Sequence, residues 1–451
     1  MPVFSPSLPW LLVKPLLVLV APLLPLWHSY FSSTRTYTNP ILEGNHADPW
    51  ILQHDNTYYL TPTMPDGTVG VFSSGTLDNF TGVLPSTVWV PPNTTTGVWA
   101  PELHRINGEF YIYCAVQDGY EDADRRMHVL RGTDTQDPTA PFIDLGQIGT
   151  WDSNYAIDGT VLQHPNGNNY FIWSGKESRE LGTVQYLYIA EMCTPYSLHS
   201  DSERVVIHSP YWPNGTRNER QWSTSNPVYG VNEGPQILTN NELTFLVYSA
   251  CGSWDPCYSL WLMGLKNSTA DPLDPDSWWS KDDEPVFFAS EVTVGTGHAS
   301  FSRDANGVPY ITYHAWDADA PAGWTSREVR TQRFDFDSEG IPVFPSAVAA
   351  GVELPGAAGQ ALTRKTSSGA ASGRCLPSQH PRNQKFTCPW TWQLSTRVVD
   401  SDIWEYHGSS GDLDASRWRA CAQDRRVYFV RRWYLSVGRV FRISRAQCLA
   451  A

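Results

Sequence analysis

Three acidic residues stand in similar surroundings at wide intervals along the 451-residue chain. Asp48, Asp158 and Glu233 each precede a glycine or a proline and then a largely apolar run, and His298 opens a comparable run further on. For any single one of the aspartates, capping of backbone N–H groups at a turn is the alternative interpretation. Carboxylates that face one another raise the pKa of at least one of them, because like charges and burial disfavour ionisation. A hydrolase uses such a set, with one carboxyl protonated as general acid and another ionised as general base.

The elements that must position these residues recur five times between about residues 39 and 345. The units start near residues 48, 102, 158, 233 and 298, and each continues with a turn, a second β-type run and a third. Turns of this composition join antiparallel strands. They are Asp55-Asn56, Asn107-Gly108, Asn166-Gly167, Asn240-Asn241 and Asn306-Gly307.

Five sheets of this kind, without helical periodicity, predict an all-β fold, a five-bladed β-propeller. An open β-sandwich is the alternative, but it does not explain why the unit recurs five times. In a propeller the first strand of each blade lines the central channel, so equivalent strand-start residues converge on the axis. Asp48, Asp158, Glu233 and His298 are predicted to hold that position in units one, three, four and five.

Composition narrows the class of partner. The formal net charge of −14 argues against nucleic acid, which needs a basic surface. Aromatic residues make up 13% of the chain, including 20 Trp, which suits both a large core and stacking on sugar rings. A propeller lectin that binds sugars without cleaving them is the alternative to an enzyme, although it has no need of three facing carboxylates.

The N-terminus predicts export. Residues 1–35 contain a short apolar run broken by two prolines, typical of a signal peptide, with an N-terminal anchor as the alternative and no membrane span expected in the mature protein. Eight cysteines fit an oxidising compartment; Cys251 and Cys257 are close enough to bridge a loop, whereas Cys114 and Cys193 suit buried thiols equally well. Four glycosylation sequons agree with export, at Asn79, Asn93, Asn214 and Asn267.

The C-terminal part differs from the rest. Residues 364–451 hold 15 Lys and Arg against 6 Asp and Glu, and they begin with a linker-like stretch, 366–373, rich in Ser, Gly and Ala. We therefore assign 1–35 to a signal segment, 36–360 to the catalytic propeller and 361–451 to a linker and basic tail. A poorly structured appendage and a small disulfide-linked carbohydrate-binding module are the two interpretations of that tail.

Five motifs together resemble glycoside hydrolase family 43 over about residues 39–355. The resemblance implies a five-bladed propeller that acts with inversion on arabinose- and xylose-containing plant cell-wall polysaccharides. The motifs, in order, are Asn45-His46-Ala47-Asp48-Pro49, Trp99-Ala100-Pro101-Glu102-Leu103, Ala156-Ile157-Asp158-Gly159, Val231-Asn232-Glu233-Gly234-Pro235 and Gly295-Thr296-Gly297-His298-Ala299-Ser300-Phe301.

The resemblance assigns roles by position. Asp48 is expected to be the general base, Glu233 the general acid, and Asp158 the residue that orients the acid and raises its pKa. Inversion further requires a gap of ~6.5–9.5 Å between base and acid to admit a water. No cofactor is expected for the chemistry, but His298 is the candidate for contact, usually through water, with a structural calcium or other ion, with a hydrogen-bonded channel histidine as the alternative.

Substrate contacts and specificity rest on the same resemblance. Arg327, or alternatively Arg330, is expected to contact the sugar or the acid, and Trp99 and Trp173 to form walls of the sugar pocket, whereas Glu102 is expected to be structural. The motifs most resemble exo-acting α-L-arabinofuranosidases that release terminal arabinofuranose from arabinan or arabino-oligosaccharides. A β-xylosidase and an endo-arabinanase are the alternatives, since both use the same three carboxylates. A secreted monomer is expected.

Overall fold

The structure is a computed structural model. It describes residues 35–92, 97–117, 119, 121–149, 154–178 and 182–359, and the backbone of four short strands beyond them, β25 (Trp404–His407), β26 (Ala420–Gln423), β27 (Arg426–Phe429) and β28 (Val440–Ile443). The predicted signal segment up to residue 34 and the sequon at Asn93 lie outside the described residues, as does most of the basic tail. Within the described part, no helix has the length and hydrophobicity needed to cross a membrane.

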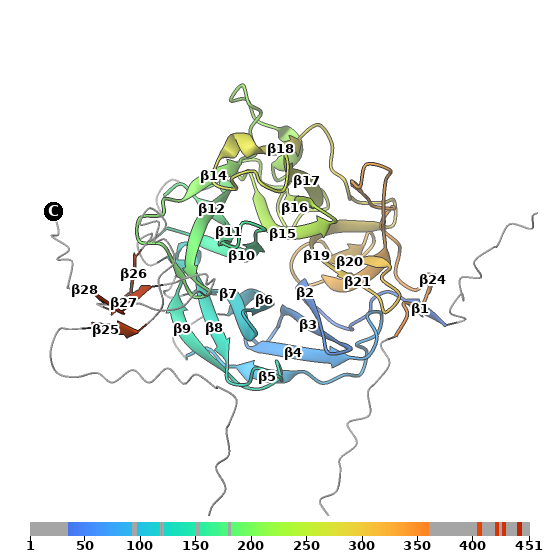
Figure 1. Cartoon of the computed structure of the whole chain (residues 1–451). Coiled ribbons are helices and arrows are strands. Elements are labelled where there is room, and N and C mark those ends of the chain that lie inside the picture. Colours follow the sequence, from blue (N-terminus) through green and yellow to red (C-terminus); the bar gives the residue numbers. More distant parts are fainter. Residues whose placement is uncertain are drawn as a thin grey trace, which may run out of the picture.

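Five antiparallel sheets stand around a central axis (Figure 1). The first strands, β2, β6, β10, β15 and β19, contact one another in turn around the ring and line its centre. The prediction of a five-bladed β-propeller is therefore confirmed. The blades are, in order, β2 (Ala47–His54), β3 (Thr57–Thr63), β4 (Val69–Ser74) and β5 (Ser86–Trp89); β6 (Val98–Ile106), β7 (Glu109–Gln117), β8 (Arg125–Gly132) and β9 (Phe142–Gln147); β10 (Ala156–Gln163), β11 (Asn169–Lys176), β12 (Gln185–Thr194), β13 (Ser197–Leu198) and β14 (Val205–His208); β15 (Asn232–Asn240), β16 (Leu243–Ala250), β17 (Ser259–Leu265) and β18 (Trp278–Lys281); and β19 (Thr293–Arg303), β20 (Pro309–Asp317) and β21 (Glu328–Arg333).

The helical content of the described residues is limited to three single 3-10 turns. These are η1 (Asp122–Asp124), η2 (Glu219–Gln221) and η3 (Pro275–Ser277). Hairpin turns lie at the predicted places, except that the fourth is Asn241-Glu242, one residue later than predicted. In the first blade Asp55 and Asn56 have φ of 45° and 61°, and in the second Asn107 and Gly108 have φ of 53° and 85°. Two successive left-handed residues match the twist of the flanking strands, which explains the Asn and Gly at these turns.

The fifth blade has three strands of its own, and the N-terminal segment completes it. The Ile41 N–H donates to the Val329 carbonyl over 2.9 Å, and Leu42 forms a bridge with Val329 on the outer strand β21. Nearby, β1 (Thr36–Thr38) pairs with β24 (Glu353–Pro355). Because the start of the propeller closes onto its last blade, the ring has no open sheet edge at this joint.

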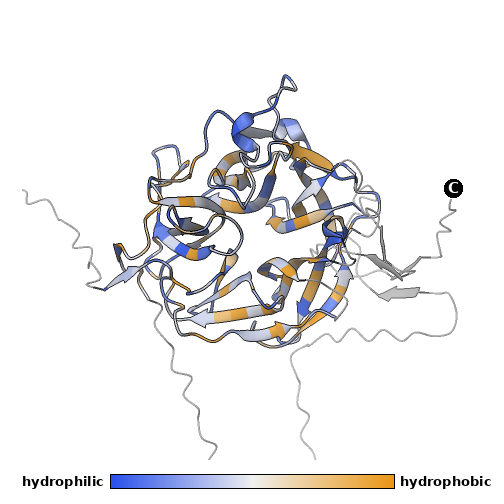
Figure 2. Ribbon diagram, turned by 180° about the vertical axis from the view of Figure 1, so that it is seen from behind, coloured by the Kyte–Doolittle hydropathy of each residue, from blue (hydrophilic) through white to orange (hydrophobic). Residues whose placement is uncertain are grey.

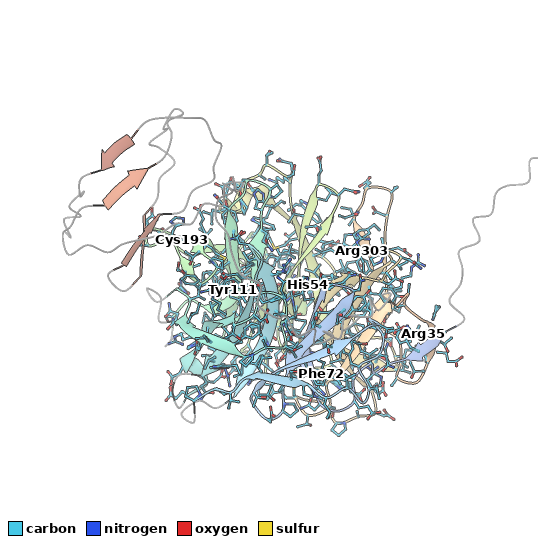
Figure 3. The ribbon with its side chains drawn as sticks, turned by 60° about the horizontal axis from the view of Figure 1, so that its bottom comes forward. Arg35, His54, Phe72, Tyr111, Cys193 and Arg303 are labelled. Atoms are coloured by element: carbon cyan, nitrogen blue, oxygen red, sulfur yellow. A yellow bond between two sulfur atoms is a disulfide. The ribbon has the colours of Figure 1, made fainter. Side chains whose placement is uncertain are left out.

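The core consists of apolar side chains packed between neighbouring blades. Figure 2 shows the hydrophobic residues following the strands, with hydrophilic residues concentrated in the connections. Phe72 of the first blade shares a buried cluster with residues of the fifth, and Tyr111 of the second blade shares one with residues of the third. Both residues are labelled in Figure 3. Two short strands outside the blades, β22 (Asp335–Phe336) and β23 (Pro342–Val343), pair with each other after the fifth blade.

The cysteines divide as follows. Cys251 and Cys257 form the predicted disulfide, which closes the connection between β16 and β17. Cys114 is a buried free thiol, whereas Cys193 is disulfide-bonded. The prediction of a buried thiol is therefore confirmed for Cys114 and wrong for Cys193.

Candidate active site

Each inner strand has a β-bulge at the same place, where two residues oppose one on the second strand. The first residue of every bulge has a left-handed backbone, a conformation that is uncommon outside glycine and that re-aims the side chain. These five residues are Asp48, Ala100, Asp158, Gly234 and His298, with φ of 53°, 43°, 56°, 53° and 45°.

The bulges correct the predicted alignment of the repeats. The position equivalent to Asp48 in the fourth blade is Gly234, so Glu233 lies one residue earlier than predicted, and in the second blade it is Ala100 and not Glu102. Glycine at 234 avoids a tight contact, because a Cβ there would approach the His298 ring to 3.1 Å; positive φ alone does not demand it, since the other four bulge residues share that φ without being glycine.

Asp48 lies at the centre of a charged cluster. Its Oδ1 is 3.3 Å from His298 Nδ1 and 3.4 Å from Arg327 Nη1, and its Oδ2 accepts a hydrogen bond of 2.7 Å from the Thr63 hydroxyl. Burial alone would raise the pKa of Asp48, but the Arg327 guanidinium and the His298 imidazolium outweigh it and hold the pKa below its ordinary value. Asp48 is therefore an ionised carboxylate.

Two histidines beneath Asp48 are in opposite charge states. Burial alone would lower the pKa of His298. The nearby carboxyl groups of Asp48, Asp158 and Glu233 outweigh burial and raise the pKa above its ordinary value, which favours the imidazolium. His314 is fully buried, which lowers its pKa to about 4, and its Nδ1 accepts a hydrogen bond of 3.1 Å from the Asp48 N–H. His314 is consequently neutral, with its proton on Nε2.

Glu233 has the environment of a carboxyl that keeps its proton. It is 6% exposed, and burial raises its pKa, an effect that the hydrogen bond from Gln185 and the charge of His298 only partly offset. The Gln185 amide donates to Glu233 Oε2 over 2.9 Å and to the Ser174 hydroxyl over 3.0 Å, which fixes the carboxyl group. Tyr258 lies beside it, fully buried and stacked on His314 with 5.4 Å between ring centroids.

Asp158 links the other groups. Its Oδ2 accepts a hydrogen bond of 3.0 Å from the Gly234 N–H and lies 3.8 Å from His298 Nδ1. Burial raises the pKa of Asp158 to about 7, helped by repulsion from Glu233 and Asp48 and opposed by His298. Because its partner Gly234 follows Glu233 directly, Asp158 fixes the backbone that carries Glu233. The structure thus brings the three predicted carboxylates and His298 together.

The predicted arginines separate clearly. Arg327 lies against Asp48 and not against Glu233. Arg330 is fully buried and pairs with Asp317 and Glu328, so it holds the fifth blade together and faces no catalytic carboxylate. The alternative in favour of Arg330 is therefore dropped.

The two predicted tryptophans also differ. Trp99 lies one residue before the bulge of the second blade, under the Arg125 guanidinium at 3.1 Å from its ring centroid. Trp173 is 5% exposed and stacks between Phe171 and Tyr188 in the core. The prediction that Trp173 forms a wall of the sugar pocket is therefore wrong, because its side chain packs in the core between the second and third blades.

Further aromatic residues, which the sequence did not single out, extend from Trp99. The Trp324 ring is 6.4 Å from Trp99 and 5.9 Å from Trp254, whose other neighbour is Tyr229 at 5.9 Å. Trp254 lies in the loop closed by the Cys251–Cys257 disulfide, and Trp324 in the connection between β20 and β21. We call Trp99, Trp324, Trp254 and Tyr229 the aromatic row.

Several polar partners of the carboxylates were also missed. Thr63 ends β3 and Gln185 begins β12, whereas His314 lies within β20, opposite Gly297 and next to the bulge of the fifth blade. All three stand in runs that read as ordinary strand sequence. For Thr63 and Gln185 the available signal was a polar residue at an end of a second or third strand. Glu102, expected to be structural, is buried and bonded to His104 and Gln236.

A calcium ion bound directly on the Nδ1 side of His298 does not fit these residues. Calcium takes six to eight oxygen ligands, and a protonated imidazole offers it no lone pair. Within the described residues, the one group of three potential ligands is Cys251, Asp255 and Cys257, and its two cysteines are joined in the disulfide. His298 itself supplies positive charge between Asp48 and Asp158.

The chain is similar to known glycoside hydrolases. The profile of the family described as glycosyl hydrolases family 43 matches residues 37–342. An extracellular exo-α-(1→5)-L-arabinofuranosidase of Streptomyces avermitilis is 30% identical over 333 residues, covering 71% of this chain and 66% of the relative. The α-L-arabinofuranosidase B of Pyricularia oryzae is 30% identical over 323 residues, covering 68% and 63%. The chain thus spans just under two thirds of the length of these two relatives.

A solved structure gives the same result. The crystal structure of an α-L-arabinofuranosidase from Lactobacillus brevis superimposes with a TM-score of 0.62 at 29% identity, and the match covers 70% of this chain and 98% of that one. A xylan β-1,4-xylosidase from Bacillus halodurans shares the fold alone, with a TM-score of 0.54 at 16% identity. With the family profile extending over more than half of its residues, the chain belongs to glycosyl hydrolases family 43.

Proposed function

We propose that the protein is an inverting exo-α-L-arabinofuranosidase that releases terminal arabinofuranose from arabinan or arabino-oligosaccharides. The observation that carries the proposal is the opposite electrostatic bias of two buried carboxyls, with the pKa of Asp48 held below and that of Glu233 above the ordinary value. The names of the relatives from Streptomyces avermitilis and Pyricularia oryzae support arabinofuranose as the sugar.

In this mechanism Asp48 removes a proton from a water molecule, whose oxygen forms the new bond to the anomeric carbon. The bond from that carbon to the leaving oxygen breaks, and Glu233 gives its proton to the leaving oxygen. One proton is taken and one is given, and attack opposite the leaving group inverts the configuration. Asp158 is the positioning residue, since it accepts a hydrogen bond from the Gly234 N–H, directly after Glu233, and is electrostatically coupled to Glu233.

The aromatic row supports exo action. It starts on the second blade with Trp99 and continues with Trp324, from a connection of the fifth blade, to Trp254 in the fourth. We infer that these meeting loops close one side of the substrate-binding region, so that a chain enters only by its end. The disulfide from Cys251 to Cys257 restrains the loop that carries Trp254.

Export, glycosylation and a monomeric state remain part of the proposal. Two relatives are named as extracellular enzymes. Asn79, Asn214 and Asn267 are exposed, as acceptors for glycosylation must be. No cofactor takes part in the proposed steps, and catalysis is assigned to residues 36–360, with 361–451 dispensable for soluble substrates.

Product analysis tests this function. Linear arabinan incubated with the enzyme should give arabinose from the first time points, and proton NMR should show the β-anomer first. Oligosaccharides as early products would instead indicate an endo-arabinanase, and preferential cleavage of xylobiose a β-xylosidase. Failure to cleave any arabinoside or xyloside would favour the lectin.

A further inference from the structure

We propose a second carbohydrate-binding site on the outer rim, between the third and fourth blades. A concavity of about 570 Å³ lies there, bordered by β14 and β18, which are neighbours at the rim in Figure 1. Its volume is in the range of small-molecule sites. It contains none of the three carboxylates and none of the aromatic row, so it is separate from the proposed active site.

Two aromatic residues supply the surface on which a sugar ring stacks. Tyr211 is held edge-on against Trp222, with 5.6 Å between centroids. The neighbouring Trp212 is partly exposed, and within the described part of the chain its indole has neither a ring partner nor a hydrogen-bond acceptor. An apolar ring face with a free N–H donor beside it suits a ligand that has C–H groups and hydroxyls together.

A fixed carboxylate supplies the polar contact. Asp282 Oδ1 lies 2.9 Å from His208 Nε2, and its Oδ2 accepts a hydrogen bond of 2.6 Å from Ser280. Burial raises the pKa of Asp282, but His208 and Ser280 outweigh it and hold the pKa below the ordinary value. A carboxylate has about four acceptor positions, so the ionised group can still receive sugar hydroxyls.

The charge of the lining selects the ligand class. The lining includes the Asp282 carboxylate and neither lysine nor arginine. This repels phosphates and uronates and favours a neutral, hydroxyl-rich chain. The lining therefore selects a neutral polysaccharide, and the choice of a pentose polymer, with arabinan as the first to try, rests on the proposed function.

The site should retain the enzyme on polymer without affecting turnover of small substrates. The experiment is affinity electrophoresis of the full chain in gels containing debranched arabinan, arabinoxylan or xylan. All proteins carry Glu233→Gln, to prevent hydrolysis, and Asn214→Gln, so that no glycan stands beside the concavity. Trp212→Ala should weaken binding to the retaining polymer roughly two- to tenfold, as loss of one aromatic contact implies.

Controls separate this site from the active site. Phe288 is 57% exposed and outside the concavity, so Phe288→Ala should leave retention unchanged. In the active enzyme, Trp212→Ala should leave kcat/KM for 4-nitrophenyl α-L-arabinofuranoside unchanged. Equal retention of the Trp212→Ala and parent proteins, or no retention of the parent by any polymer, would overturn the second site. Because binding is read without turnover, failure of the proposed activity gives a different result.

Discussion

Removal of the Arg327 charge should move the acidic limb of the pH profile. The guanidinium Nη1 lies 3.4 Å from Asp48 Oδ1. At an effective dielectric constant of 20, this separation corresponds to about 5 kcal/mol, or about 3.5 pH units in the pKa of Asp48. The side chain of Arg327 is 12% exposed, so we treat this value as an upper bound.

The sign follows from the role of Asp48. A general base must be ionised, and in the wild type its pKa is held below the ordinary value. In Arg327→Met, His298 is the main group left to oppose the effect of burial, so the pKa of Asp48 rises. As the pH is lowered, Asp48 is then protonated, and activity lost, at a higher pH than in the wild type. We expect the acidic limb of kcat/KM to shift upward by between one and three pH units, roughly, within the bound set by the Coulomb energy.

The assay is kcat/KM for 4-nitrophenyl α-L-arabinofuranoside, by stopped time points from pH 3 to 9. Each protein is also returned to neutral pH after exposure, to exclude loss of the fold. The control is Arg333→Met, which removes an exposed arginine from the end of β21, the strand that Arg327 directly precedes. A uniform fall in kcat/KM with an unmoved acidic limb would refute the electrostatic argument and leave Arg327 as a sugar contact.

Three further variants test the other roles. Glu233→Gln should lower kcat/KM on arabinobiose by about 10²- to 10⁴-fold, and much less on the 4-nitrophenyl glycoside, whose leaving group needs no proton; equal losses would contradict the acid role. Asp158→Asn removes a negative charge coupled to Glu233, so the pKa of Glu233 falls and the alkaline limb should move to lower pH; a fixed limb would count against this. Tyr258→Phe removes a hydroxyl that lowers the pKa of Glu233, so that limb should move to higher pH, whereas Tyr313→Phe, whose hydroxyl bonds Gln332, should leave it in place.

The blades were predictable because their signals are local. A turn such as Asn107-Gly108 fixes the register of its hairpin, and alternating apolar runs mark the strands on either side. Recurrence then gave the number of blades. The segment that completes the last blade was harder to predict, because Ile41 and Leu42, which pair with β21, come from the opposite end of the chain.

The site was predictable in its carboxylates but not in its geometry. Matching residues by chemical type aligned Glu233 with Asp48, whereas the backbone aligns Gly234, and no local pattern marks a left-handed residue at Ala100. The prediction for Trp173 was wrong because the sequence alone does not distinguish a tryptophan that packs in the core from one that stacks on a sugar. Gln185 reaches Glu233 only through folding, over 48 residues of sequence.

The charges of the site explain why one carboxyl keeps its proton. Two cations, Arg327 and the His298 imidazolium, both approach Asp48, and His298 also lies near Asp158. Two positive charges balance two of the three carboxylates and leave a third that is costly to ionise in a buried site. Within the described residues, Glu233 has no cation within ion-pair distance and is held by the neutral amide of Gln185. The position of the cations favours the proton on Glu233, and Asp158, whose pKa is also raised, to about 7, shares it. The number of charges thus makes one carboxyl an acid, and the position of the cations decides which one.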